Sequence, residues 1–349
     1  MQPMSASRIT KAWERRGLLA CLLLPVTLVY TVLQSTRRCL YRWQMLKSRK
    51  VDCTVIVVGN VVAGGAGKTP TTIGIVHHLQ RRGMQVGVVS RGYGRTDRSP
   101  CAVSADTAAE IAGDEPLLIA RATGVPVFVA ASRHEAASAL LAAHPKTQAI
   151  VCDDGLQHYG LYRDIEICVF DDRGTGNGWL LPSGPLREPW PRKLLANVGQ
   201  SSARQMVLHT GAHAAFKGFQ ATRRLADVAL ARDASTTRLA SLQGPLLALA
   251  GIARPEVFFT FLQAAGLQLA KTLPLPDHFD FAGLDLSELQ GYTVLCTEKD
   301  AGKLWKLWPQ ALAVPLVQTL EPAFLSALDD TVNDVVTAKL SSTHGHQTA

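Results

Sequence analysis

A glycine-rich segment between an apolar run and a helical pattern restricts the fold of this chain more than any other part of its sequence. Val55 to Val58 is predicted as a strand and Thr69 to Arg81 as a helix, and between them lies Gly64-Gly65-Ala66-Gly67-Lys68-Thr69-Pro70. A strand, a glycine loop and a helix in this order form a phosphate cradle. Glycines let backbone amides approach phosphate oxygens, and the helix N-terminus adds a positive dipole. We therefore expect these loop residues to bind the phosphates of a nucleotide, with Lys68 as a catalytic cation at the β and γ phosphates and Thr69 as a Mg²⁺ ligand.

The loop departs from the standard spacing of such motifs. That spacing puts a glycine at position 62, where Val62 stands. The paired glycines resemble the variant loop of partition and metallochaperone ATPases, which carry a lysine just before the pair, where this chain has Ala63. A membrane-associated regulatory ATPase or GTPase of that class is the alternative function. A third reading is a structural peripheral protein with a vestigial loop, in which Lys68 or Asp153 would be dispensable.

Two carboxylates follow a second apolar run. Ala149 to Cys152 is predicted as a strand and leads into Asp153 and Asp154. A phosphate loop requires a carboxylate at the end of a nearby strand to hold the metal and its waters. We expect Thr69, Asp153 and Asp154 to hold Mg²⁺, although an Asp-Asp pair taken alone is as often a turn or a helix cap.

Short apolar runs alternate with helical stretches from residue 52 onward, which predicts an α/β fold of P-loop NTPase type, a parallel sheet wrapped by helices. A second α/β pattern begins near residue 201. We expect a core domain at 51–200, a smaller α/β domain at 201–340 that closes over the nucleotide, and a disordered tail at 341–349. The other predicted elements are strands at 85–89, 125–130, 206–209, 246–250 and 293–296 and helices at 133–143 and 255–265.

The positive charge of the chain is confined to its first 50 residues. They hold ten Lys or Arg against Glu14 alone, so the net charge of +8 leaves −1 for the remaining 299 residues. The remaining 299 residues therefore lack the excess of basic residues that a nucleic-acid-binding surface requires. Gly17 to Leu33 is almost wholly apolar and has basic residues on both sides. We expect a helix or helical hairpin in residues 1–50 that lies on an anionic membrane surface. A single membrane span and a helix packed on the soluble body are the alternatives.

Several longer strings resemble the tetraacyldisaccharide 4'-kinases of lipid A synthesis. They begin with the glycine loop and end with Thr297-Glu298-Lys299-Asp300-Ala301, and between these lie Ser90 to Arg95, Gly113 to Pro116, Asp153 to His158, Leu181 to Pro189 and Pro276 to His278. The resemblance implies ATP- and Mg²⁺-dependent phosphorylation of the 4'-hydroxyl of a lipid disaccharide 1-phosphate. It implies a peripheral or monotopic enzyme at the cytoplasmic face of the bacterial inner membrane, with no obligate protein partner.

The same resemblance maps a catalytic pair onto Asp114 and His278. A carboxylate that fixes the tautomer of an imidazole and raises its basicity is a sensible proton acceptor for a hydroxyl. Without the resemblance, Asp114 could cap a helix, and a lone loop histidine is usually structural. Residues expected to contact the substrate are Arg91, Tyr93, Arg95, Glu115 and His158.

Overall fold

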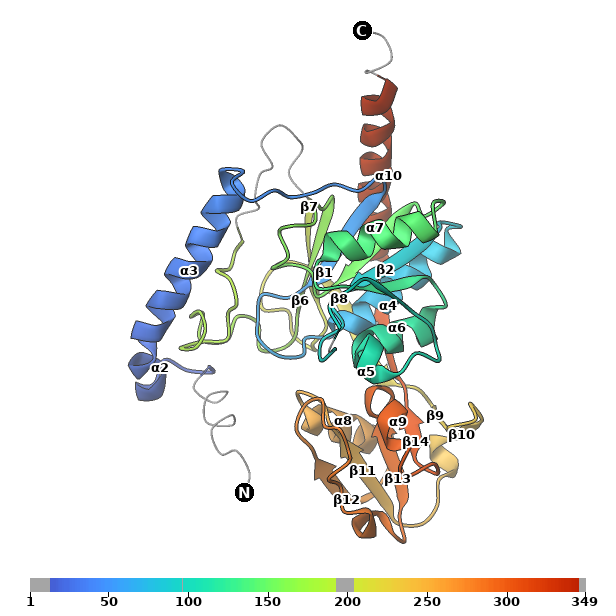
Figure 1. The fold of residues 1–349 in the computed structure, drawn as a ribbon. Coiled ribbons are helices and arrows are strands. Elements are labelled where there is room, and N and C mark those ends of the chain that lie inside the picture. The colour runs from blue at the N-terminus through green and yellow to red at the C-terminus, as the bar shows by residue number, and fades with distance from the viewer. Residues whose placement is uncertain (1–12, 96, 193–203, 345–349) are drawn as a thin grey trace.

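The computed structural model describes residues 13–95, 97–192 and 204–344, which form an α/β fold built on two sheets (Figure 1). In Figure 1 the larger sheet stands above the smaller one, and helices α2 and α3 lie beside the larger sheet. We call the part built on the larger sheet the first lobe. The part between Val228 and Val314, built on the smaller sheet, is the second lobe.

Nine strands of the described residues form the sheet of the first lobe, in the order β15-β8-β7-β6-β1-β5-β2-β4-β3. The strands from β8 to β4 pair in parallel, and β15 and β3 join the two edges antiparallel. The expectation of a mainly parallel sheet is therefore confirmed. The strands are β1 Thr54–Gly59, β2 Val86–Ser90, β3 Cys101–Val103, β4 Val127–Val129, β5 Ala149–Asp153, β6 Ile165–Phe170, β7 Arg204–His209, β8 Phe219–Leu225 and β15 Leu316–Leu320.

Helices cover both faces of this sheet because its central strands are apolar on both sides. In β1, Ile56 and Val58 face one core cluster, and Val55 and Val57 face the other. A strand buried along its whole length is typical of a parallel sheet between two helical layers. Helices α4, α6 and α10 contribute to the first cluster and α7 to the second. The helices of this lobe are α4 Lys68–Arg81, α5 Ala109–Ala112, α6 Asp114–Thr123, α7 Arg133–Ala143 and α10 Pro322–His344.

The second lobe has a six-stranded sheet in the order β10-β9-β14-β13-β11-β12. Strands β12, β11, β13 and β14 are parallel, whereas β9 and β10 are antiparallel to their neighbours. Its strands are β9 Val228–Leu230, β10 Thr236–Arg238, β11 Leu246–Ala250, β12 Leu269–Pro274, β13 Thr293–Thr297 and β14 Leu312–Val314. Its helices are α8 Pro255–Ala264 and α9 Glu298–Leu304, with short 3₁₀ turns at Leu239–Ser241 and Leu286–Leu289.

The domain boundary expected near residue 201 does not match the sheets. Strand β7 belongs to the first lobe, where it pairs with β6 from Ile165↔Arg204 to Phe170↔His209. The chain also returns to the first lobe at its end, because Phe324 of α10 is packed in the same core as β1. The second lobe is therefore an insertion between β8 and β15. A short apolar run indicates a strand but not the strands with which it pairs. The prediction therefore placed β7 in the second domain, and the boundary with it.

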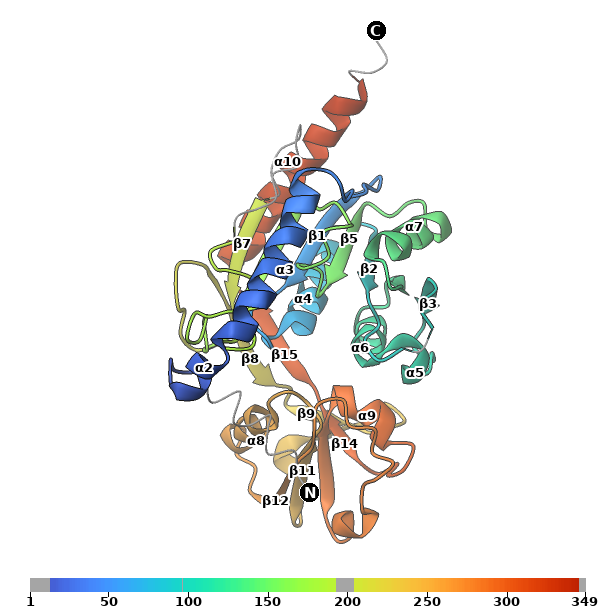
Figure 2. The same ribbon diagram turned by 60° about the vertical axis from the view of Figure 1, so that its left-hand side comes forward.

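Helices α2 (Leu18–Leu22) and α3 (Leu24–Arg42) form the N-terminal arm, which runs along one side of the first lobe (Figure 2). Pro25 lies in the first turn of α3, the part of a helix that tolerates proline, and the apolar run divides just before it. Within the described ranges, no helix combines the length and apolar character needed to cross a bilayer. Residues 1–12 of the expected arm lie outside the described residues.

The C-terminal residues differ in part from the expected disordered tail. Helix α10 continues to His344, so that expectation is wrong for Ser341–His344. Residues 345–349 lie outside the described residues.

Candidate active site

The loop between β1 and α4 has the backbone geometry of a phosphate cradle. Gly64 and Gly67 have φ angles of +94° and +83°, a left-handed conformation that residues with side chains rarely adopt. Four consecutive carbonyl groups of the loop accept side-chain hydrogen bonds. The donors are Arg173 to Ala63 (3.1 Å) and Gly65 (3.2 Å), Asn60 to Gly64 (3.2 Å) and Thr210 to Ala66 (2.9 Å). With its carbonyls held by these groups, the loop can present its amides to an anion at the start of α4.

Lys68, the first residue of α4, reaches toward the carboxylates at the end of β5. Its side chain is largely buried, and its Nζ lies 3.8 Å from Oδ1 of Asp154. Arg187 Nη1 lies 3.4 Å from both oxygens of the same carboxylate. Burial raises the pKa of Asp154, but the positive charges of Lys68 and Arg187 outweigh it, so the pKa lies below its ordinary value. Asp154 is therefore an ionised partner of both cations.

Asp153 is fully buried beside the same loop. Thr72 Oγ1 donates to its Oδ1 (2.8 Å), and Thr69 Oγ1 lies 3.5 Å from its Oδ2. Burial and the negative charges of Glu115 and Asp154 raise the pKa of Asp153 to about 7. A cation bound beside this carboxylate would favour its ionised form and lower its pKa.

The donor set around Thr69 fits Mg²⁺. In the described part of the chain, no cluster of three or more His, Cys, Asp or Glu is arranged to hold a metal by itself. Magnesium usually takes one or two protein oxygens and completes its octahedron with phosphate and water. A hydroxyl from Thr69 and a carboxylate from Asp153 match that need.

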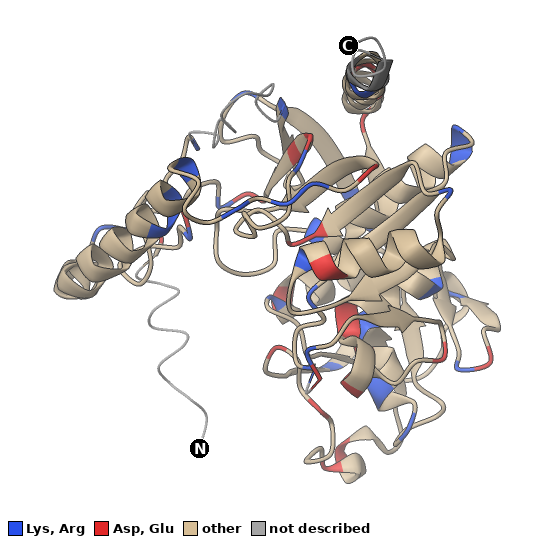
Figure 3. Cartoon of the chain, turned by 45° about the horizontal axis from the view of Figure 1, so that its top comes forward, with Lys and Arg blue, Asp and Glu red and all other residues tan. Residues whose placement is uncertain are grey.

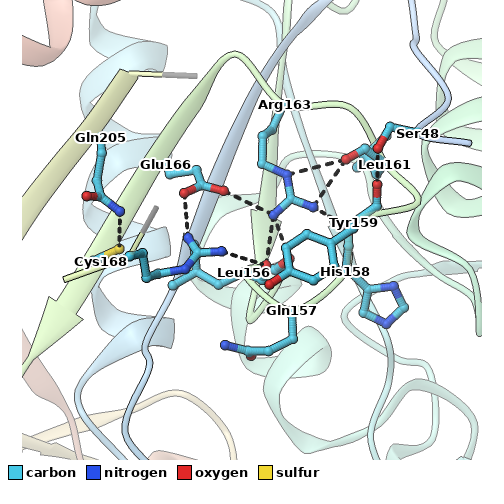
Figure 4. Close-up of polar contacts among 12 residues, drawn as sticks. Ser48, Leu156, Gln157, His158, Tyr159, Leu161, Arg163, Glu166, Cys168 and Gln205 are labelled. Carbon is cyan, nitrogen blue, oxygen red and sulfur yellow. Dashed lines mark hydrogen bonds and ion pairs between the residues drawn. The ribbon is translucent and has the colours of Figure 1, made fainter. Parts of the chain in front are cut away.

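Buried arginines hold the segment that follows Asp154 (Figure 4). Arg163 donates to the carbonyls of Leu156 (2.9 Å) and His158 and pairs with Glu166 at 3.3 Å. Arg133 donates to the carbonyl of Asp154 at 3.0 Å. Burial and the positive charges of Arg133 and Arg91 lower the pKa of His158 to about 3, so this imidazole is neutral near pH 7.

Asp114 and His278 meet across the two lobes. Asp114 opens α6 of the first lobe, and His278 follows β12 in the second. Nδ1 of His278 lies 3.0 Å from Oδ2 of Asp114, and Lys303 of α9 donates to the same oxygen at 2.7 Å. Burial raises the pKa of Asp114, but the hydrogen bonds from His278 and Lys303 outweigh it and lower the pKa below its ordinary value. An ionised carboxylate therefore orients the imidazole.

Comparison with known proteins accounts for this combination of a phosphate loop and a carboxylate–imidazole pair. The family model described as tetraacyldisaccharide-1-P 4'-kinase matches residues 19–333. The chain belongs to this family. A tetraacyldisaccharide 4'-kinase of Polaromonas naphthalenivorans is 55% identical over 345 residues, which cover 97% of this chain and 98% of the relative. The tetraacyldisaccharide 4'-kinase of Polaromonas sp. strain JS666 is 54% identical and is covered completely.

A solved structure of LpxK from Aquifex aeolicus in complex with ATP is similar across most of the chain. It is 27% identical, has a TM-score of 0.75, and the match covers 91% of this chain and 99% of that one. Membership of the 4'-kinase family confirms the expected ATP-dependent kinase of lipid A synthesis. The alternative of a regulatory ATPase or GTPase is not supported.

The substrate residues expected in this 4'-kinase are only partly gathered near the pair. The ring of Tyr93 is exposed and its centroid lies 5.1 Å from that of His278. Glu115 Oε1 lies 4.0 Å from Lys299 Nζ. Arg95 turns back on its own loop, where its Nη2 donates to the carbonyl of Ser99 at 3.0 Å. Arg91 is close enough to His158 to lower its pKa.

Sequence reasoning missed several residues that the structure places around the phosphate loop and the Asp114–His278 pair. Lys303 could have been found, because it stands four residues after Lys299 and shares its face of a helix. Arg133 opens a helix just after a strand, at the carboxyl edge where ligands of parallel sheets bind. Arg173 gave no signal, because an arginine in a loop three residues after β6 matches no motif that indicates a contact with the phosphate loop.

Proposed function

We propose that this kinase transfers the γ-phosphoryl group of ATP to the 4'-hydroxyl of a tetraacylated diglucosamine 1-phosphate, with Asp114 and His278 as its proton-accepting pair. The contact of 3.0 Å between Nδ1 of His278 and Oδ2 of Asp114 carries this proposal. The ATP complex of the Aquifex aeolicus relative supports the nucleotide.

The pair is arranged to accept a proton at one defined atom. Ionised Asp114 favours the tautomer of His278 with its proton on Nδ1, which leaves the Nε2 lone pair to accept the proton of the hydroxyl. Lys303 holds the carboxylate from its other side. In the structure Lys299 Nζ lies 3.4 Å from Nε2, within hydrogen-bonding distance, and also donates to Asp277 Oδ1 at 3.0 Å. The hydroxyl would replace Lys299 at Nε2, and the ammonium group would stay close enough to stabilise negative charge on the transferring group.

We assign the phosphates of ATP to the backbone amides of Gly64, Gly65, Ala66 and Gly67 and to the side chain of Lys68. Thr69 and Pro70, which has no N–H to donate, complete the nucleotide-binding segment. Thr69 and Asp153 would hold Mg²⁺, with Asp154 beside them. A bound Mg²⁺ would neutralise charge on the phosphates and fix their orientation. Arg187 keeps Asp154 paired when Lys68 turns to a phosphate.

The lipid disaccharide is assigned to the space around the pair. The exposed ring of Tyr93 lies beside that of His278, tilted by 42°, and offers an aromatic face for a sugar. His158 is neutral and can form a hydrogen bond with the sugar. The nearby positive charges of Arg91 and Arg133 would attract the phosphate group of a phosphorylated sugar. Glu115 is assigned to the same surface through its approach to Lys299, whereas Arg95 would reach that surface only by leaving the carbonyl of Ser99.

The arm is proposed to lie on the anionic cytoplasmic face of the bacterial inner membrane, as a peripheral or monotopic element. One side of α3 is tied to the first lobe, where Thr27 Oγ1 donates to Ser183 Oγ at 2.7 Å and Tyr30 Oη to the carbonyl of Arg187 at 2.8 Å. The other side of the arm, on both α2 and α3, carries exposed apolar side chains. Its largest exposed fractions are those of Leu18 (87%), Leu22 (76%), Leu28 (66%) and Leu33 (65%).

Basic residues stand next to this apolar surface. Figure 3 shows Lys and Arg at the C-terminal end of α3 and along the segment that leads to β1. Apolar burial and attraction to anionic lipid would act together there. The tie to Arg187 would also bring the membrane surface close to the site, where a lipid substrate must arrive.

The test is incubation of the purified full chain with ATP labelled in its γ-phosphate, Mg²⁺ and the lipid disaccharide 1-phosphate in detergent. Label in a lipid bisphosphate, absent for a substrate without a free 4'-hydroxyl, is the expected result. ATP hydrolysis with no labelled lipid would reject the proposal.

A further inference from the structure

Asp171, just after β6, is a buried carboxylate that binds arginines from both lobes. Its side chain is 2% exposed. Arg173 of the first lobe donates through Nε to both carboxylate oxygens, at 3.0 and 2.9 Å, and Arg254 of the second lobe donates through Nη1 to Oδ2 at 3.1 Å. Two guanidinium groups therefore share one anion at the junction of the lobes.

The arginine of the first lobe shapes the phosphate loop. While its Nε is held by Asp171, Arg173 donates through Nη1 to the carbonyl of Ala63 and through Nη2 to that of Gly65. Its guanidinium is thus occupied on every edge by the loop and by Asp171. This arrangement does not depend on Arg254.

The arginine of the second lobe ends a short segment, Gly251 to Arg254, that contacts both halves of the site. At one end, the carbonyl of Gly251 accepts a hydrogen bond from the backbone amide of His278 (3.1 Å), and its amide donates to Asp300 Oδ2 (3.0 Å). At the other end, a Cβ atom built on Gly65 would lie 3.7 Å from Cβ of Ala253, which is van der Waals distance. The segment therefore lies between Gly65 of the phosphate loop and the backbone amide of His278.

His278 needs such support because its backbone is in an unfavourable region. Its φ angle is +62°, which is uncommon for a residue with a side chain. The hydrogen bond to Gly251 holds that conformation, and the position of Gly251 depends on where the segment is anchored. The ion pairs of Lys303 with Asp114, Lys299 with Glu115 and Lys306 with Glu110 join the second lobe to α5 and α6. The pair of Arg254 with Asp171 instead joins it to the carboxylate that holds Arg173 on the phosphate loop.

We propose that the Asp171–Arg254 ion pair is a latch that fixes the second lobe on the phosphate loop, and that Arg254 is a positioning residue for the transfer because it sets His278 against Asp114. The inference rests on the proposed pairing of Asp114 and His278. Arg254 acts through the Gly251 segment and contacts neither of these side chains.

The test compares Arg254→Ala with its parent in the full chain, using the lipid disaccharide 1-phosphate in detergent and a separate equilibrium measurement of ATP binding. Since Arg173 and Asp171 stay in place, we expect ATP affinity within about twofold, and kcat lower by about 10- to 100-fold, the size of effect that misplacement of a reacting group produces. Arg254→Lys keeps a cation and should recover part of the loss. Arg238→Ala, an exposed arginine on β10, is the matched control.

The double variant Arg254→Ala/His278→Ala decides whether the arginine acts through the imidazole. If it does, Arg254→Ala adds little to the loss caused by His278→Ala. A full multiplicative loss, or a fall in ATP affinity as large as that in kcat, would overturn the latch. A normal kcat in His278→Ala alone would instead reject the proposed catalytic pair, and the latch with it.

Discussion

Nδ1 of His278 lies 3.0 Å from Oδ2 of Asp114, although 164 positions separate the two residues in the chain. The contact joins the first helical turn of α6 in one lobe to a loop of the other. It therefore exists only when the two lobes are together, and chemistry that depends on it is tied to lobe closure. The same carboxylate also accepts a hydrogen bond from Lys303, so the second lobe holds Asp114 at two points.

Removal of either member of this pair should lower kcat with little change in ATP affinity. Asp114→Ala and His278→Ala are each expected to cost about 10²- to 10⁴-fold, the usual range for a general base. Because the two act as one unit, the double variant should lose far less than the product of the single losses. Steady-state kinetics on the three variants measure this. Multiplicative losses would separate the residues into independent roles.

Lys68→Ala should abolish turnover and leave the fold intact. The lysine contributes positive charge at the expected phosphate site, and loss of one such group costs at least about a thousandfold when charge develops there. Asp154 keeps Arg187 as a partner, so the melting temperature should change little. Lys271→Ala, which removes a partly exposed lysine of the second lobe that pairs with Glu288, is the control and should retain full activity. Near-normal turnover by folded Lys68→Ala would disprove the role of this loop.

Much of this site follows from local sequence, and the rest depends on contacts that local sequence does not encode. The loop from Gly64 to Thr69 was predictable because its glycines and lysine serve one purpose at fixed spacing. The strand before Asp153 was predictable from its apolar residues. Asp114 and His278 were paired only through the resemblance, since nothing in either string indicates a partner in another lobe.

The fold shows the same division between local and distant information. Helix Arg133–Ala143 and strand Leu246–Ala250 match their predicted bounds, because periodicity and flanking residues define them. Strand β7 was predicted but assigned to the wrong domain, since pairing with β6 is a tertiary choice. The alternation of strand and helix patterns also does not indicate that the chain returns to the first lobe through β15 and α10.

Asp153 should make stability depend on pH in the absence of Mg²⁺. Its pKa in the folded chain, about 7, lies above the ordinary value of 3.8, so the folded state holds this proton more strongly than the unfolded state. The resulting stabilisation is present below about pH 4 and is lost as the pH rises through about 7. Asp153→Asn has no carboxyl group to deprotonate, so its folded state is not destabilised as the pH rises through about 7. The variant should therefore melt higher than its parent at pH 8 in a chelator, with a smaller difference at pH 5.

Asp154→Asn is the matched control for this pH effect. The pKa of Asp154 is lowered in the folded chain, so its contribution to stability is present above its ordinary pKa and is lost at lower pH. Its asparagine variant should melt lower than the parent at pH 8. If both variants shift the melting temperature in the same direction at pH 8, the opposite environments assigned to the two carboxylates are wrong.

The exposed apolar surface of the arm should carry membrane binding without contributing to the packing of α3 on the first lobe. Leu22 and Val29 are 76% and 60% exposed, whereas Thr27 and Tyr30 face Ser183 and Arg187. A buried side chain of this size contributes about 1.5–3 kcal/mol, so Leu22→Glu/Val29→Glu should weaken binding to anionic vesicles by at least about tenfold. Activity on a short-chain substrate in detergent should change little, because the ties to the first lobe remain.

Two comparisons separate the apolar and electrostatic parts of that binding. Leu307→Glu, which changes an exposed leucine of the second lobe, should leave vesicle sedimentation unchanged. Raising the salt concentration should weaken binding of the parent only in part, since salt screens the basic residues of the arm but not apolar burial. If the double glutamate variant still sediments with the affinity of the parent, the membrane surface lies on another part of the molecule, and the approach of the lipid to Asp114 and His278 must be sought there.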